Sequence, residues 1–338
     1  MEHTVTKSGL GTAALMTLLA AATAAIALTS LFIGYAPLPA ADIIGGLFTD
    51  QGTTTGIIMR EIRLPRMLLG LLAGAALGMS GAALQGLLRN PLAEPGVMGI
   101  ASFASLGAVI AIYFGISTSF SLALPILAMS GALIAAALLS LFASRENSVL
   151  TLILAGVALA NLAAALMALA LNLAPNPYAL SEIVFWLLGS LKDRSLDDVF
   201  LSAPFVALGL ALLASSGRAL DALTLGEDAA KSLGIEVASI SRRVTLGVAL
   251  AVGASVAVTG AIAFVGLIVP HLCRPFFGHV PSKLLWPSAL GGALLVSVAD
   301  VAVRLVPSGP ELMLGVFTSL IGVPFFLWLI FKLRREMQ

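Results

Sequence analysis

The side chains that could bind a metal or attack a substrate are few in this chain and are poorly arranged for either task. His271, Cys273 and His279 lie close together in the segment PHLCRPFFGH, and imidazole and thiolate are common metal ligands. Their spacing matches no metal-site pattern and no carboxylates accompany them, so we interpret the histidines as structural or interfacial. The phosphate-binding pattern G-x-x-x-x-G-K-[ST] does not occur, and neither a nucleophile–base arrangement nor a pair of carboxylates is evident. We therefore predict a chain that is not an enzyme, binds no metal or cofactor, and cannot hydrolyse ATP by itself.

The composition indicates a polytopic membrane protein. The chain has 338 residues, of which 59% are hydrophobic and only 10% are charged, whereas a soluble protein carries about 25% charged residues. A net charge of +1 excludes a strongly basic nucleic-acid binder. A single cysteine cannot form an intrachain disulfide.

Long apolar runs predict an all-α protein with ten transmembrane helices in one membrane domain, residues 1–338. The expected spans are 11–34, 64–88, 96–114, 120–142, 148–173, 197–214, 240–263, 264–278, 284–306 and 311–333. The first run could be read as a signal peptide, but it is longer than the usual apolar region of about 7–15 residues, so we interpret it as a retained span. The eighth is short and contains Pro270, which makes its ends the least defined.

The distribution of basic residues predicts that both termini are cytoplasmic. An even number of spans places both ends on one side, and the cytoplasmic assignment leaves twelve Lys and Arg residues inside and six outside, which satisfies the positive-inside rule. The inside set is Lys7, Arg89, Arg145, Arg218, Lys231, Arg242, Arg243, Arg274, Lys283, Lys332, Arg334 and Arg335. The outside set is Arg60, Arg63, Arg66, Lys192, Arg194 and Arg304.

The loop of about residues 215–238 differs from the other inter-span loops, most of which are a few residues of turn. Its sequence, SSGRALDALTLGEDAAKSLGIEVA, combines apolar Leu220, Leu223 and Leu233 with charged Asp221 and Glu227 in a helix-like pattern. An ordered polar element of this kind suits the docking of a partner, and the predicted orientation places it in the cytoplasm.

Residues 74–91 and 253–270 resemble each other. Gly-Ala recurs seven residues on in both segments, and both close with a Gly-Leu pair and a proline. The segments fall on the second and seventh spans, which run in opposite directions, so we predict an inverted repeat of spans 2–5 and 7–10. Chance similarity between Gly/Ala-rich helices is the alternative.

Arginines at the predicted outer side run against the charge bias. Arg63, Arg66 and Arg304 could form a cluster that attracts an acidic partner, or they could reach lipid headgroups. Asp300 precedes Arg304 by four residues, which predicts a local ion pair; a proton relay is the alternative role for Asp300.

A rigid turn follows the second span. The sequence RNPLAEPG has two prolines around a polar Asn and Glu, which end the helix and fix the chain. This turn lies on the cytoplasmic side, where a permeation path must close, although a plain interhelix turn would also fit.

Together these residues resemble the iron-chelate and vitamin B12 permease family of ABC importers. The matching stretches run in order over most of the chain: 63–66, 81–85, 90–96, 225–227, 260–274, 300–304 and 315–326. The resemblance implies a bacterial inner-membrane permease with ten helices. It also implies a homodimer or close heterodimer, two cytoplasmic ATPase subunits that hold ATP and Mg, and an external binding protein that delivers the ligand.

The resemblance also implies roles for individual residues. Those that hold the ATPase are Leu225, Gly226, Glu227, Asp228, Ala229, Ala230, Leu233 and Gly234. Those that meet acidic residues of the binding protein are Arg63, Arg66 and Arg304. Those of the cytoplasmic gate are Asn90, Pro91, Leu92, Ser148, Val149 and Leu150. At the second part of the gate the chain departs from the family, because Val149 and Leu150 replace hydroxyl residues of some relatives.

The expected function is alternating-access import of a ferric siderophore, driven by ATP hydrolysis in the partner chain. Cobalamin and haem are alternative cargos. Uncharged residues that we predict along the pathway are Gln85, Asn161, Met167 and Asn172. A secondary transporter would need buried mid-span carboxylates, and only Asp300 comes near that requirement. A structural subunit without cargo is the third possibility.

Overall fold

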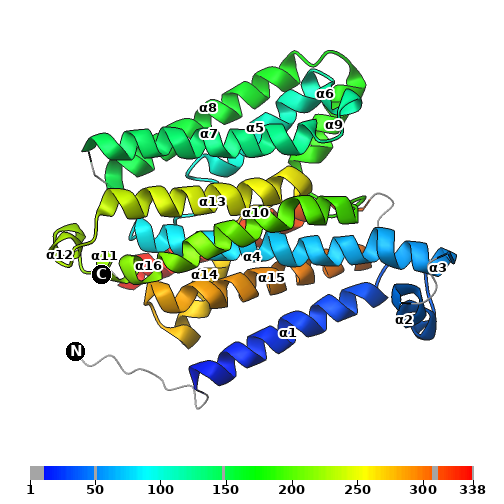
Figure 1. Cartoon of the computed structure of the whole chain (residues 1–338), viewed down its shortest axis with the longest axis horizontal. Coiled ribbons are helices and arrows are strands. Elements are labelled where there is room, and N and C mark those ends of the chain that lie inside the picture. The colour runs from blue at the N-terminus through cyan, green and yellow to red at the C-terminus, as the bar shows by residue number, and fades with distance from the viewer. Residues whose placement is uncertain (1–10, 49–51, 147–148, 307–310, 337–338) are drawn as a thin grey trace.

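The protein is a bundle of long helices, seen in a computed structural model that describes residues 11–48, 52–146, 149–306 and 311–336 (Figure 1). The longer helices are α1 (Thr12–Phe32), α4 (Leu64–Leu87), α5 (Ile100–Tyr113), α7 (Ala123–Glu146), α8 (Val149–Asn172), α10 (Leu196–Ser215), α13 (Val237–Thr259), α14 (Val265–Phe277), α15 (Pro281–Leu305) and α16 (Leu314–Glu336). Shorter ones are α2 (Ala40–Phe48), α3 (Thr54–Ile57), a π-helical turn (Ile58–Arg63), α6 (Ile116–Ser119), α9 (Pro177–Leu187), α11 (Gly217–Leu223) and α12 (Glu227–Ser232).

Each of the ten predicted spans corresponds to one helix of the bundle, but two of these helices are too short to cross a bilayer. Within the described residues, eight helices are long and apolar enough to cross a membrane, and one of them runs without a break from Thr54 to Leu87. Helices α5 and α14 have only 14 and 13 residues, whereas about 20 are needed to span the hydrocarbon core. The predicted span 96–114 was longer than α5 because it included loop residues 96–99, whereas the predicted span 264–278 was already short and matches α14 to within one residue at each end.

The second half of the chain repeats the helix pattern of the first half in the opposite direction. Helices α4, α5, α7 and α8 have 24, 14, 24 and 24 residues, and α13, α14, α15 and α16 have 23, 13, 25 and 23. Both short helices begin after a left-handed residue, Gly99 or Phe264. Figure 1 shows α4 and α13 running in opposite directions. The predicted inverted repeat is therefore present in the helix order. Its sequence register differs from the prediction, because Pro91 lies in a loop while Pro270 lies inside α14.

Small residues on α4 allow an unusually close approach of α15. A Cβ atom added at Gly74 would overlap the backbone carbonyl of Gly292, and one added at Gly78 would overlap that of Ser288. Gly81 meets Gly266 of α14 in the same way. Close backbone approach of this kind is a usual means of joining helices in membranes. Helices α4 and α13 are the most enclosed spans of the described bundle, because 72% of the most apolar stretch of each is buried.

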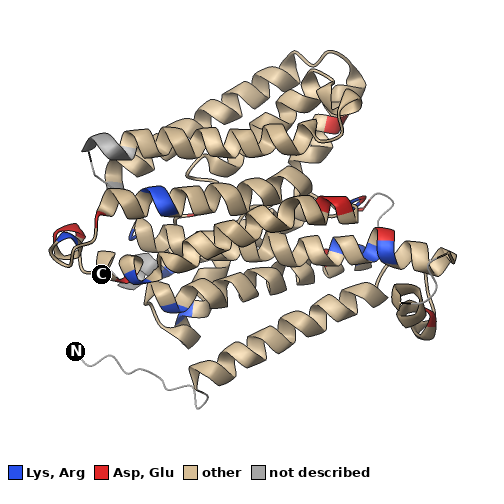
Figure 2. Cartoon of the chain, viewed as in Figure 1, with Lys and Arg blue, Asp and Glu red and all other residues tan. Residues whose placement is uncertain are grey.

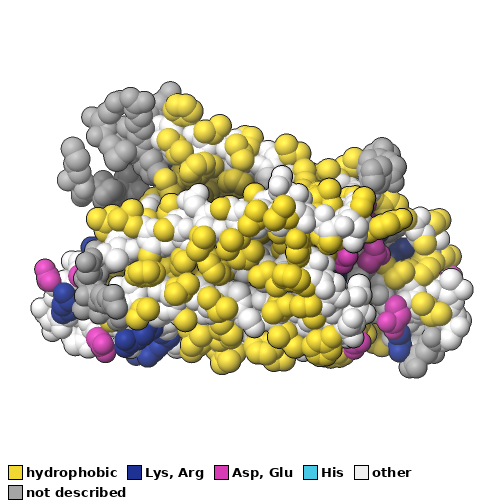
Figure 3. Space-filling model, turned by 90° about the horizontal axis from the view of Figure 1, so that it is seen from above, with side chains coloured by type: hydrophobic (Ala, Val, Ile, Leu, Met, Phe, Trp, Pro, Cys, Tyr) yellow, Lys and Arg dark blue, Asp and Glu magenta, His cyan; other side chains and the backbone are white. Residues whose placement is uncertain are grey.

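Charged side chains gather at the two ends of the bundle (Figure 2). Between them lies a broad band of hydrophobic side chains (Figure 3), as expected for a chain that crosses a bilayer. Helix α12 lies at the end where α1 begins and α16 ends (Figure 1). We call this the α12 end, and the other, where α3 lies, the α3 end.

Candidate functional site

The predicted coupling residues form one protruding element at the α12 end. Helix α12 is bracketed by Gly226 and Gly234, whose φ angles of 105° and 79° are left-handed and suit glycine. Leu225 and Leu233 on either side of it are 69% and 64% exposed. The Asp228 side chain is fully exposed. Apolar side chains exposed beside a charged one, away from the apolar band, suit a protein partner.

The same element is held firmly to the bundle from beneath. Ala230 of α12 and Leu220 and Leu223 of α11 are buried in the main core. Asp221 accepts a hydrogen bond of 2.8 Å from the backbone N–H of Ser282, at the start of α15. A force applied to α11 is therefore passed to α15 through a core contact and a capped helix end.

The first part of the predicted gate is a well-defined turn after α4. The Asn90 side chain accepts a hydrogen bond of 2.9 Å from the backbone N–H of Leu92, which fixes an Asx turn. Leu92 packs against a hydrophobic cluster formed by Leu267 and Ile268 of α14 and Leu329 of α16. A cavity of about 290 Å³ between this turn, α11 and α14 is lined in part by Gln85, Asn90 and Pro91.

The second part of the predicted gate falls at the start of α8. Ser148 lies outside the described residues. Val149 is the first residue of α8, and Leu150 is 63% exposed. The two-part gate stays a prediction.

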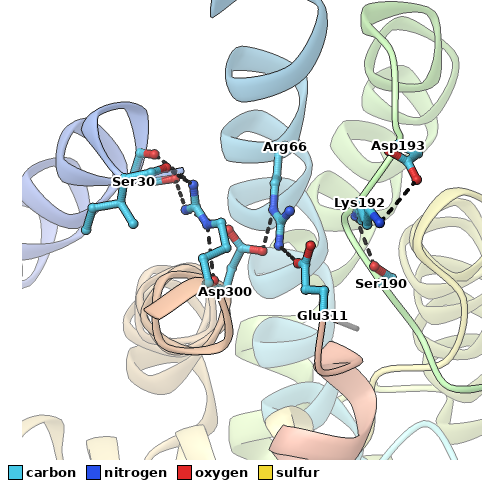
Figure 4. Close-up of polar contacts among 9 residues, drawn as sticks. Ser30, Arg66, Ser190, Lys192, Asp193, Asp300 and Glu311 are labelled. Atoms are coloured by element: carbon cyan, nitrogen blue, oxygen red, sulfur yellow. Dashed lines mark hydrogen bonds and ion pairs between the residues drawn. The ribbon is translucent and has the colours of Figure 1, made fainter. Parts of the chain in front are cut away.

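The three arginines predicted to dock the binding protein are buried. Arg63, Arg66 and Arg304 are only 4%, 7% and 9% exposed. Figure 4 shows Arg66 between two carboxylates: its Nε is 2.8 Å from Asp300, and its Nη2 bonds Glu311. The predicted Asp300–Arg304 ion pair is present, at 2.8 Å. Asp300 therefore pairs with both Arg66 and Arg304 inside the chain, and the docking role of the three arginines stays a prediction.

Two of these arginines also hold the end of α1. Arg304 donates to the carbonyl oxygens of Ser30 and Ile33, and Arg63 donates to those of Leu31 and Ala36. The last carbonyls of a helix have no partners within the helix and carry partial negative charge, which a guanidinium group satisfies well. The arginines therefore join α1 to the bundle at the α3 end.

The predicted pathway residues fall in two separate places. Gln85 is 5% exposed; its amide donates to the carbonyl of Gly266, and its Oε1 accepts a 2.6 Å bond from Arg274. Asn161, Met167 and Asn172 lie on α8, where Met167 is half-buried and both asparagines are exposed. Gln85 thus sits with the turn at 90–92, whereas the other three lie on an outer helix.

Glu94 is a residue whose environment the sequence did not reveal. It lies in the loop between α4 and α5, where burial raises the pKa of its carboxyl group to about 7, opposed by a hydrogen bond from the backbone of Phe264. The only sequence signal was its position between Pro91 and Pro95 in a rigid turn. Its contact with Phe264 links the loop before α5 to the loop before α14, so the two halves of the repeat meet there.

Known proteins share this architecture and sequence. A model described as the FecCD transport family matches residues 21–332. The chain belongs to the FecCD transport family. It is 41% identical, over 86% of its length and 83% of the relative's, to the uncharacterized ABC transporter permease protein YvrB of Bacillus subtilis. It is 37% identical, over 86% of its length and 88% of the relative's, to the vitamin B12 import system permease protein BtuC of Shigella boydii.

A solved structure has the same fold. It is described as a metal-chelate type ABC transporter in an inward-facing conformation, with a TM-score of 0.82 and 33% sequence identity. The match covers 95% of this chain and all of the other. This member of the FecCD family is accordingly a permease subunit of an ABC importer, a class whose ATPase is a separate chain. Its position in the family leaves the cargo open.

Proposed function

We propose that this FecCD family member imports a ferric siderophore or a similar large iron chelate across the bacterial inner membrane. The observation that most directly supports import driven by a separate ATPase is α12, a short helix between two left-handed glycines that presents Leu225, Asp228 and Leu233 at one end of the bundle. A cytoplasmic ATPase would dock there, one on each of two permease subunits, and bring ATP and Mg with it. Closure of the ATPase pair would then move α11 and α12 as levers.

The charge distribution supports a cytoplasmic α12 end. Arg89, Arg218, Arg242, Arg243 and Lys283 lie in or beside the helix ends there. The predicted loops at the α12 end carry twelve Lys and Arg residues, and those at the α3 end carry six. The positive-inside rule counts these residues whether or not they are paired, so it favours cytoplasmic termini.

The exposed face of α8 supports a pathway between two subunits. Asn161 is close to the middle of this 24-residue helix and is exposed, with one amide hydrogen bonded to the carbonyl of Val157. The rest of an amide facing hydrocarbon would be costly, so this face suits a water-lined path or a subunit contact better than lipid. Asn161, Met167 and Asn172 would line the path in a homodimer, with the turn at 90–92 as its inner closure.

An external binding protein would deliver the cargo at the α3 end. Docking through Arg63, Arg66 and Arg304 would require these side chains to exchange Asp300, Glu311 and the α1 carbonyls for carboxylates of the partner. Such an exchange preserves the number of charge-assisted bonds, and it links arrival of the binding protein to release of α1 and of the segment before α16.

Cobalamin is the second candidate cargo, since relatives 37% identical to this chain are named as vitamin B12 import permeases. Haem is a third. All three are large, and they suit a wide cavity with weak contacts along its wall.

Transport in vesicles tests the proposal. The permease is reconstituted with its ATPase and binding protein, and uptake of a ferric hydroxamate, cyanocobalamin and haemin is measured with and without ATP. We expect ATP-dependent uptake of the ferric chelate in preference to the other two. ATP-dependent uptake that prefers cyanocobalamin or haemin would refute the proposed cargo and support the proposed mechanism. Uptake driven by a proton gradient without the ATPase would refute the mechanism.

A further inference from the structure

Arg89 occupies a backbone position that normally belongs to glycine. Helix α4 ends in a Schellman motif: the backbone N–H of Asn90 bonds the carbonyl of Gln85, and that of Arg89 bonds the carbonyl of Gly86. The residue at this position is left-handed, and Arg89 has a φ of 46°. Among the described residues only Arg89, Asp193 and Phe264 combine a side chain with a positive φ. This left-handed backbone position favours glycine, so an arginine here carries a strain that a role for its side chain would explain.

The Arg89 side chain reaches the first residue of α12. Its Nη2 is 3.5 Å from Oε1 of Glu227, and the two side chains are 41% and 22% exposed. Of the ion pairs found in the described part of the chain, this is the one that joins α12 to another element; the Lys231–Asp228 pair lies within α12. The gate turn at 90–92 begins at the next residue after Arg89.

Helix α11 touches α4 just before Arg89, since a Cβ atom added at Gly86 would lie 3.6 Å from the Cβ of Leu220. Beside that contact, a cavity of about 290 Å³ is lined by Asn90 and Pro91 and by Thr224 at the end of α11. Helix α11 is also bound to α15 through Asp221 and Ser282. Movement of α11 therefore acts on α15 and on the end of α4, whereas α12 reaches the residue before the gate turn through a pair of side chains.

We propose that Arg89 and Glu227 are positioning residues that transmit movement of α12 to the gate turn. The inference rests on the proposed function, in which α12 carries the ATPase. The pair does not touch the cargo and is not needed for folding; it sets the position of residues 90–92 relative to the docked ATPase. Loss of the pair should leave ATP hydrolysis running with less cargo moved for each ATP.

The test measures uptake and ATP hydrolysis in the reconstituted full transporter, using a ferric hydroxamate and cyanocobalamin as probes. We expect Arg89→Glu and Glu227→Arg each to lower the uptake per ATP hydrolysed by about two- to fivefold, the range expected for a partly exposed ion pair. The double variant Arg89→Glu/Glu227→Arg restores the pair with opposite polarity and should recover most of the ratio.

Arg89→Gly separates the side chain from the backbone. Glycine suits the left-handed position, so the melting midpoint should be unchanged or higher while uptake per ATP falls as in Arg89→Glu. If Arg89 were purely structural, Arg89→Gly would lower the melting midpoint and leave the uptake per ATP unchanged. The matched control is Arg242→Glu, which breaks the exposed pair with Glu236 (3.7 Å) at the start of α13 and should leave the ratio unchanged.

Three results would overturn the inference. They are unchanged coupling in Arg89→Gly, failure of the double variant to recover, and loss of ATPase co-purification in Arg89→Gly, which would place Arg89 in docking instead of transmission. Absence of ATP-driven uptake by the unaltered transporter is a different result, because it refutes the proposed function itself.

Discussion

Replacing Asp300 with Asn should strongly destabilise the protein. The two oxygens of this carboxylate accept from different arginines, Oδ1 from Arg66 and Oδ2 from Arg304, both at 2.8 Å. All three side chains are at most 8% exposed. Breaking a buried ion pair from one side costs about 3–5 kcal/mol, because a buried charge is left without its partner.

The remaining contacts set the magnitude at the lower end of that range. Arg66 keeps Glu311, and Arg304 keeps the carbonyls of Ser30 and Ile33. We therefore expect a loss of about 3 kcal/mol. At roughly 2 °C per kcal/mol, the melting midpoint in detergent should fall by roughly 6 °C. Because the pairs are buried, added salt should change this difference little.

The control is Asp193→Asn, an exposed acid at the same end whose carboxylate is 3.9 Å from Lys192 and 84% exposed. Its left-handed φ of 55° suits Asn, so its melting midpoint should stay close to that of the unaltered protein. Equal melting of Asp300→Asn and Asp193→Asn would refute the reasoning.

The variant Arg66→Glu separates two roles of Arg66. If Arg66 only docks the binding protein, the variant should have normal stability and a lower affinity for that protein. If Arg66 holds the buried ion-pair network, the variant should melt at a lower temperature.

Three further outcomes follow from particular contacts. Gly78→Ala should cost about 1–3 kcal/mol in thermal unfolding, because its methyl group meets the Ser288 carbonyl; Gly70→Ala, with more room, should cost less, and equal melting would contradict the tight contact. The pKa of the Glu94 carboxyl is raised from 4.5 to about 7, so the folded protein keeps a proton that the unfolded chain has lost, and stability should fall as the pH rises from about 4.5 to 7. A Glu94→Gln protein should lack that slope, and a flat profile for the unaltered protein would contradict the burial of Glu94. Replacing Leu225 and Leu233 together with Ser should weaken ATPase co-purification about tenfold or more, while Lys192→Ser should have no effect; equal binding by both would remove α12 as the docking element.

Patterns between near neighbours in the sequence predicted the structure well. The long apolar runs marked the spans, and the four-residue spacing of Asp300 and Arg304 marked their ion pair. Each of these signals depends on the geometry of a single helix. The helical pattern of the loop that contains α12 was visible for the same reason, since its polar residues and glycines lie within one loop.

Contacts between distant parts of the chain could not be read in this way. Arg66 lies 234 residues from Asp300 and 245 from Glu311, so nothing local shows that its charge is satisfied internally. Gln85 and Arg274 are 189 residues apart, and the amide that looked available to cargo is bound to that arginine. Uncharged polar residues and arginines in a membrane segment look alike whether they face a path or a partner helix. Only the packing of the repeat distinguishes the two.

The inverted repeat explains why these hidden contacts lie at opposite ends of one helix. Arg66 begins α4 and bonds α15 at the α3 end, whereas Gln85 closes α4 and is bonded by α14 at the α12 end. Helix α4 is thus fixed at both ends and is closely packed against α15 between them. The apolar stretches of α4, α13 and α15 are 72%, 72% and 61% buried, whereas those of α1 and α8 are 22% buried and those of α10 and α16 are 28% buried. The enclosed frame of the bundle is therefore α4, α13 and α15, and α1, α8, α10 and α16 form its less covered periphery.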